Sequence, residues 1–134
     1  MKAFSYLLRG LLVIALLLAI AMPAMAQDPV VVAPALHKVK LDNKKVRVYE
    51  VMAKAGDKMA MHWHPDHIVC PLKDGKVKFT MPDGKTREAD MKAGEAIWVD
   101  SQSHSVEFLT DASAMVIELK KKEKKEMKEP KQGK

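Results

Sequence analysis

The sequence predicts an all-β domain, and three observations lead to that prediction. Clusters of turn-forming residues recur at intervals of about 8 to 12 residues, as in β-sandwiches and barrels. Several segments between the turns alternate apolar and polar residues, which is typical of strands with one buried face. No stretch of the domain repeats its apolar residues with a strong period of about 3.6 residues, so long amphipathic helices are not expected.

The first clear strand is predicted at 44–53 (KKVRVYEVMA), where valines alternate with Arg47 and Tyr49. The segment 55–58 (AGDK) supplies the turn that follows it. The clearest hairpin joins 76–81 to 85–91 through an Asp-Gly turn, because that dipeptide favours the tight turns of β-hairpins.

Two further strands close the predicted domain. In 103–109 (SHSVEFL), His104, Val106 and Phe108 share one face, because successive side chains of a strand alternate. The segment 113–120 (SAMVIELK) is the last strand, and the lysine run after it marks the end of the domain.

The first 26 of the 134 residues have the pattern of a bacterial export signal. Lys2 and Arg9 precede an apolar core at 11–22, which is too short to span a bilayer comfortably. The small residues around Ala26 form a cleavage site. We therefore expect cleavage after Ala26 and an exported, periplasmic or secreted protein.

The expected mature chain has a lead-in (27–36), one domain (37–119) and a Lys/Glu-rich tail (120–134). The stretch 27–119 carries 13 basic and 14 acidic residues, so the excess positive charge lies in the tail. Such a tail is expected to be disordered and to make at most weak contact with an anionic surface. Nothing in the domain resembles a nucleic-acid-binding surface, and no nucleic-acid partner is expected.

Three histidines form the strongest functional signal. His62 and His64 are two residues apart, so a strand would place both imidazoles on one face. His104 lies about forty residues later in another predicted strand. Neutral imidazole is the commonest side-chain ligand of transition metals, so these residues are a candidate metal tripod, with His67 as a fourth candidate.

The segments around these histidines resemble the two motifs of the cupin superfamily. In the first, five residues separate Gly56 from His62-Trp63-His64, and Gly75 stands at the position of the final glycine. In the second motif, Gly94 is followed by five residues, by Asp-Ser-Gln in place of Pro-x-Gly, and then by the third histidine. The resemblance implies a single double-stranded β-helix (jelly-roll) barrel over 37–119, with His62, His64 and His104 as metal ligands.

One position departs from the pattern, because Ile68 stands where the first cupin motif has a metal-binding glutamate. Three arrangements remain open: a metal held by three histidines and water, a site with His67 as fourth ligand, and a metal-free barrel. In the family, this glutamate points into the barrel. Because Cys70, the single cysteine, is two residues after Ile68, alternation along the strand predicts that Cys70 also points inward and lies near the metal.

The sequence thus predicts an exported small cupin with a divalent transition metal (Fe, Zn, Mn, Ni or Cu) that binds or transforms a small, anionic molecule. The resemblance implies dioxygenase or isomerase chemistry if the chain is an enzyme. The alternatives are a non-catalytic binding or sequestration module of the cell envelope and a metal-free structural β-barrel. A homodimer through an N-terminal edge strand, 36–41 or 46–51, is a further expectation.

Overall fold

A computed structural model describes residues 27–121, so the predictions for the leader (1–26) and for tail residues 122–134 lie outside the described residues. The described chain forms two short helical segments followed by nine strands. These are α2 (Pro29–Val32), η1 (Pro34–Leu36), β1 (His37–Asp42), β2 (Val46–Ala53), β3 (Lys58–His64), β4 (His67–Pro71), β5 (Gly75–Thr80), β6 (Thr86–Met91), β7 (Ile97–Val99), β8 (Gln102–Phe108) and β9 (Ala112–Leu119).

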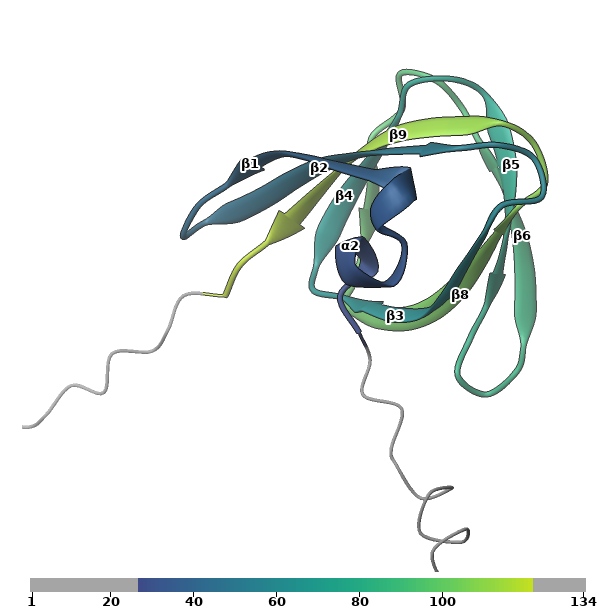
Figure 1. Ribbon diagram of the computed structural model, residues 1–134, viewed down its shortest axis with the longest axis horizontal. Coiled ribbons are helices and arrows are strands. Elements are labelled where there is room, and N and C mark those ends of the chain that lie inside the picture. The colour runs from purple at the N-terminus through teal and green to yellow at the C-terminus, as the bar shows by residue number, and fades with distance from the viewer. Residues whose placement is uncertain (1–26, 122–134) are drawn as a thin grey trace, which may run out of the picture.

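The strands form two antiparallel sheets that face each other around a common interior. One sheet has five strands in the order β1-β2-β9-β4-β7, and the other has four in the order β3-β8-β5-β6. Strands that are far apart in the sequence, such as β3 and β8, are neighbours in this arrangement (Figure 1). The prediction of an all-β barrel is therefore confirmed.

The hairpin expected from the Asp-Gly turn is the pair β5 and β6. Their register runs without interruption from Gly75 opposite Met91 to Thr80 opposite Thr86. Gly84 has φ +82°, a conformation that glycine adopts without the steric penalty of a side chain. The turn chemistry read from the sequence thus fixes the register of this hairpin.

Apolar side chains fill only part of the barrel interior. A buried cluster joins Met59 of β3, Val77 of β5, and Val106 and Phe108 of β8, together with Ala53 of β2. Removing a side chain such as Phe108 from this cluster would cost about 3–5 kcal/mol of stability. The part of the interior that this cluster leaves open contains the histidines.

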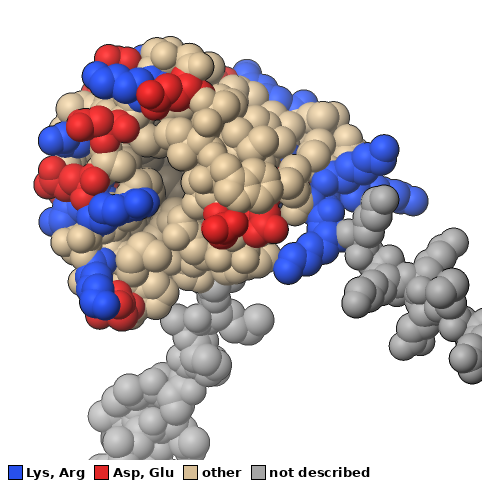
Figure 2. Space-filling model, turned by 180° about the vertical axis from the view of Figure 1, so that it is seen from behind, with Lys and Arg blue, Asp and Glu red and all other residues tan. Residues whose placement is uncertain are grey.

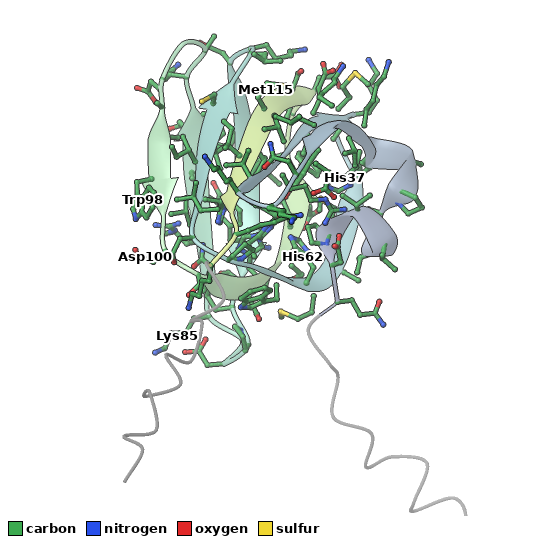
Figure 3. The ribbon with its side chains drawn as sticks, turned by 90° about the vertical axis from the view of Figure 1, so that its left-hand side faces the viewer. His37, His62, Lys85, Trp98, Asp100 and Met115 are labelled. Carbon is green, nitrogen blue, oxygen red and sulfur yellow. The ribbon has the colours of Figure 1, made fainter. Side chains whose placement is uncertain are left out.

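The N-terminal segment covers one end of the barrel (Figures 1 and 3). Asp28 begins α2 by accepting a hydrogen bond from the backbone N–H of Val30 (2.8 Å), and Pro29 at the first helical position is fully buried. The backbone oxygen of Gln27 accepts a hydrogen bond from the N–H of Trp63 in β3 (3.0 Å). Within residues 27–121, no helix has the length and apolar character needed to cross a membrane.

Candidate metal centre

The structure brings His62, His64 and His104 together inside the barrel. His62 lies directly opposite His104 in the β3–β8 pair, and His64 is on the same face of β3. Their exposed fractions are 0%, 5% and 5%. One potential ligand atom from each imidazole lies within 4.8 Å of those of the other two.

A bulge in β3 aims His62 into the interior. Met59 and His62 are both buried although they are three residues apart, which regular alternation would not allow. The register of β3 against β8 shifts between these two residues. Such a shift adds a residue on one strand and turns the following side chain to the other face. The two-residue spacing of His62 and His64 then places both imidazoles inward.

The hydrogen bonds of the cluster leave imidazole nitrogens free for a ligand. His62 Nδ1–H donates to the backbone oxygen of Ala60 (2.7 Å), which leaves His62 Nε2 buried with no partner among the described residues. His104 Nδ1 is likewise buried without a partner. Unsatisfied buried polar atoms cost free energy, and a bound metal would satisfy them. The donor set therefore fits a divalent transition metal.

A buried carboxylate stands behind His64. Glu118 of β9 accepts a hydrogen bond at Oε1 from His64 Nδ1–H (2.9 Å) and another from the hydroxyl of Tyr49 (2.9 Å). The Tyr49 hydroxyl oxygen is also 3.2 Å from His64 Nδ1. A carboxylate that accepts the Nδ1 proton fixes the tautomer of an imidazole and leaves Nε2 available to bind a metal.

Arg47 links this carboxylate to the N-terminal segment. The Arg47 guanidinium lies 3.9 Å from Glu118 Oε2 and forms an ion pair with Asp28 next to α2. A chain of polar contacts thus runs from Asp28 through Arg47 and Glu118 to His64. The segment that covers the end of the barrel is therefore coupled to the orientation of a candidate ligand.

The interior favours neutral imidazoles. Burial, reinforced by the other imidazoles, lowers the pKa of His64 to about 2 and that of His104 to about 3. Burial also lowers the pKa of His62 and raises that of the Glu118 carboxyl, although the Tyr49 hydrogen bond and the Arg47 charge favour the ionised form of Glu118. Neutral imidazoles are the form that binds metals, so the three histidines are ready to bind near neutral pH.

His67 lies beside this cluster on the opposite sheet. It is 2% exposed, and its ring stacks on that of His64 with a centroid distance of 4.5 Å. Its Nδ1–H donates to the backbone oxygen of Pro65 (2.8 Å). Among the described residues, the set of ligand atoms within 4.8 Å of one another contains only His62, His64 and His104, so a ligand role for His67 remains a prediction.

The expected inward orientation of Cys70 and Ile68 is wrong. His67 and Val69 are the β4 residues that line the interior cavity, so Ile68 and Cys70 alternate to the outer face. Cys70 pairs there with Met115 of β9. The count from the motif fails by one residue because alternation does not continue through the Pro65–Asp66 loop between β3 and β4. His67, rather than Ile68, consequently takes the inward position.

Two interior residues were missed because no motif marks them. His37 opens β1, donates from Nδ1–H to the backbone oxygen of Ala33 (2.7 Å), and packs edge-on to the Tyr49 ring at 5.2 Å. Glu118 alternates inward with Val116 in the last strand, so the pattern of that strand could have identified it. With His37 included, all five histidines of the chain line one cavity.

That cavity has a volume of about 250 Å³ and is mostly apolar. Figure 3 shows His37 and His62 toward the end covered by α2, whereas Trp98 lies on the far side. Figure 2, seen from the other end, shows a hollow in the surface beside charged side chains of both signs. Apart from the histidines, the polar lining residues are Tyr49, Arg87, Asp90 and Gln102.

Comparison with known proteins supports the fold at low sequence identity. No model of a protein family matches the sequence, and no curated protein matches it. A cupin domain from Bordetella pertussis Tohama I superposes with a TM-score of 0.58 and 25% identity, over 63% of this chain and 92% of that one.

Two further solved structures superpose with lower identity. A cupin superfamily protein from Desulfitobacterium hafniense DCB-2 has a TM-score of 0.52 and 14% identity, over 64% of this chain and 77% of the other. A conserved protein of unknown function from Streptococcus pyogenes has a TM-score of 0.51 and 15% identity, over 75% of this chain and 91% of the other. The chain therefore has the fold of the cupin superfamily.

Proposed function

We propose that this chain is a metal-dependent cupin that binds or transforms a small molecule in its histidine-lined cavity. His62, His64 and His104 would hold a divalent transition metal, one of Fe, Zn, Mn, Ni or Cu. The observation that carries the proposal is the cluster of three buried imidazoles, two of which have a buried nitrogen with no hydrogen-bond partner among the described residues.

A metal bound in this way would act as a Lewis acid toward a ligand in the cavity. The chain's own residues supply the rest of the site. Glu118 orients His64, the apolar lining excludes water from the ligand, and His67 stands beside His64 on the opposite sheet. Cupin chemistry such as dioxygenation or isomerisation is the enzymatic form of this proposal.

Elemental analysis of the purified protein tests the proposal. The wild type is compared with His62→Ala, which removes one imidazole of the cluster. We expect close to one equivalent of a single transition metal in the wild type and a loss of most of it in the variant. Trp63→Phe is the matched control, because Trp63 lies between the two histidines on the exposed face of the same strand.

Two results would contradict the proposal. One is a wild-type protein that holds no transition metal and takes up none from added Zn²⁺ or Fe²⁺. The other is equal metal content in wild type and His62→Ala. The first result would favour the metal-free structural barrel, and the second would show that any bound metal lies elsewhere.

A non-catalytic binding module is the second candidate. The observation in its favour is that Glu118 is the only buried carboxylate among residues 27–121, and it is already engaged by His64 and Tyr49. The other carboxylate that lines the cavity, Asp90, is exposed and pairs with Lys76, so no buried carboxylate remains to act as general acid or base. Binding of a small molecule by the metal-loaded protein without conversion would support this candidate.

We also propose that the protein is exported and processed after Ala26. The proposal is supported by the charge, apolar core and small residues of positions 1–26. Mass spectrometry of the protein from the periplasmic fraction would show a chain beginning at Gln27. A full-length chain in the cytoplasmic fraction would contradict it.

A further inference from the structure

The strand β6 contributes two charged residues to the lining of the cavity, Arg87 and Asp90. In the register of the β5–β6 hairpin, Arg87 lies opposite Phe79, and Phe79 lines the cavity. Arg87 and Ala89 line the cavity as well. The neighbouring acids Glu88 and Asp90 have Lys76 as their ion-pair partner, at 3.5 and 3.9 Å. Arg87 is thus the one cation of this hairpin that lines the cavity, and the residue is exposed there.

The Arg87 guanidinium is held near the histidines but has no counter-ion. Its central carbon lies 5.7 Å from the centroid of the Phe79 ring, and that ring lies 4.9 Å from the His104 ring. Among residues 27–121, no carboxylate forms an ion pair with Arg87. A guanidinium stacked on an aromatic face keeps its N–H donors free in the ring plane.

The rest of the cavity indicates what binds to this cation. The lining contains apolar side chains from both sheets, such as Val51, Val69 and Val99. Asp90, the acidic residue of the lining, pairs with Lys76 at 3.9 Å. A ligand that matches this lining has an apolar body and a single anionic group.

We propose that Arg87 is the specificity-determining residue of the cavity and binds the carboxylate of a small, apolar monocarboxylic acid. The fork of N–H donors in a guanidinium matches the two oxygens of a carboxylate. A phosphate would share this chemistry but carries about two charges, and the lining offers Arg87 as its one permanent cation. The inference rests on the same cavity as the proposed function and deepens it by naming the ligand class.

The test compares three probes that differ only in the polar group: benzoate, benzamide and phenyl phosphate. Binding to the Zn²⁺-loaded protein and to the chelator-treated protein is measured by titration calorimetry and by amide NMR shifts. We expect benzoate to bind about 10- to 100-fold more tightly than benzamide, as for a hydrogen-bonded charge pair. Phenyl phosphate should bind more weakly than benzoate.

The variant Arg87→Met removes the charge and keeps an apolar side chain. It should lose the preference for benzoate over benzamide while its zinc content stays at the wild-type level. Lys78→Met is the matched control, because Lys78 lies on the same hairpin next to Phe79 but does not line the cavity. The control should keep the preference. Arg87→Lys keeps the charge but lacks the planar fork of donors, so it should keep only part of the preference for benzoate over benzamide.

Several results would overturn the inference. They are equal binding of benzoate and benzamide, no binding of either, tighter binding of phenyl phosphate, and an equal loss in Lys78→Met. The metal measurement separates this inference from the proposed function. Benzoate binding that depends on Arg87 in a protein that takes up no transition metal would sustain the inference and reject the metal site. Metal binding without an Arg87-dependent preference for benzoate would reject the inference and leave the proposed function in place.

Discussion

The two sheets of the barrel contribute different parts of the candidate site. The four-stranded sheet carries His62, His64 and His104 on the adjacent strands β3 and β8. The five-stranded sheet carries the groups that contact them from across the interior, Glu118 and His67. The spacing of the three histidines is therefore set by the register of one strand pair, whereas their orientation depends on how the barrel closes.

The largest effect is expected from removing the contribution of the four-stranded sheet. In His62→Ala/His104→Ala, two of the three imidazoles are lost, and we expect Zn²⁺ affinity to fall by well over 100-fold, beyond the effect of changing an outer contact. Equilibrium dialysis against a competing chelator measures it. Circular dichroism shows whether the variant still folds. A folded double variant with wild-type affinity would show that the metal binds elsewhere.

The pH dependence of stability tests the burial of the imidazoles on the four-stranded sheet. In the unfolded chain a histidine titrates near pH 6.5, whereas burial lowers the pKa of His104 to about 3 and that of His64 to about 2. Below about pH 6.5 the unfolded chain therefore binds more protons than the folded one. Stability should be fully present above that pH and fall as the pH decreases toward 3.

Urea unfolding of the chelator-treated protein measures this effect. The slope should approach ~1.4 kcal/mol per pH unit for each proton that the unfolded state takes up in excess. The Glu118 carboxyl acts in the opposite direction, because burial raises its pKa. A free energy of unfolding that stays constant from pH 7 to pH 4 would show that the histidines are solvated rather than buried.

A smaller effect on metal affinity is expected from changing Glu118, the carboxylate on the five-stranded sheet that contacts His64. Glu118→Gln keeps the shape of the side chain and removes its charge, so His64 loses a charged acceptor at Nδ1. We expect metal affinity to fall by about 10- to 100-fold. Tyr49→Phe removes the other hydrogen bond to the same oxygen and should have a weaker effect.

The absorption spectrum of the bound metal shows whether Glu118 positions His64 at the site or only stabilises the fold. With Co²⁺ as the bound ion, Glu118→Gln should change the visible absorption bands while the thermal unfolding of the apoprotein changes little. Glu50→Gln is the control, since Glu50 lies on the neighbouring strand and pairs with Lys40 outside the cavity. Identical affinity and spectra in wild type and Glu118→Gln would show that the carboxylate does not act on the site.

The same difference between the sheets explains what could be predicted from the sequence. His62, His64 and His104 were found because their spacing and flanking glycines depend on local strand and turn geometry. Glu118 and His37 were not found, because their contacts with His64 and Tyr49 join residues that meet only when the barrel closes.

The error at Ile68 has a local cause. Alternation can be counted within a strand, but the count does not continue through a loop such as Pro65–Asp66. Within β4 the alternation itself is regular, since His67 and Val69 both line the cavity. The bulge in β3 shows the same limit, because strict alternation from Met59 would have turned His62 outward.

The smallest predicted effect tests that one-residue difference directly. His67→Glu places a carboxylate on the inward face of β4, whereas Ile68→Glu, which restores the family motif in the sequence, places it on the outer face. We expect the first variant to bind Zn²⁺ about tenfold more tightly, equivalent to ~1.4 kcal/mol, and the second to match the wild type. Tighter binding by Ile68→Glu alone would mean that β4 turns Ile68 inward. Because the two variants carry the same new charge one residue apart, net charge alone predicts equal affinities, and tighter binding by His67→Glu despite the loss of an imidazole would come from the inward position of the new carboxylate.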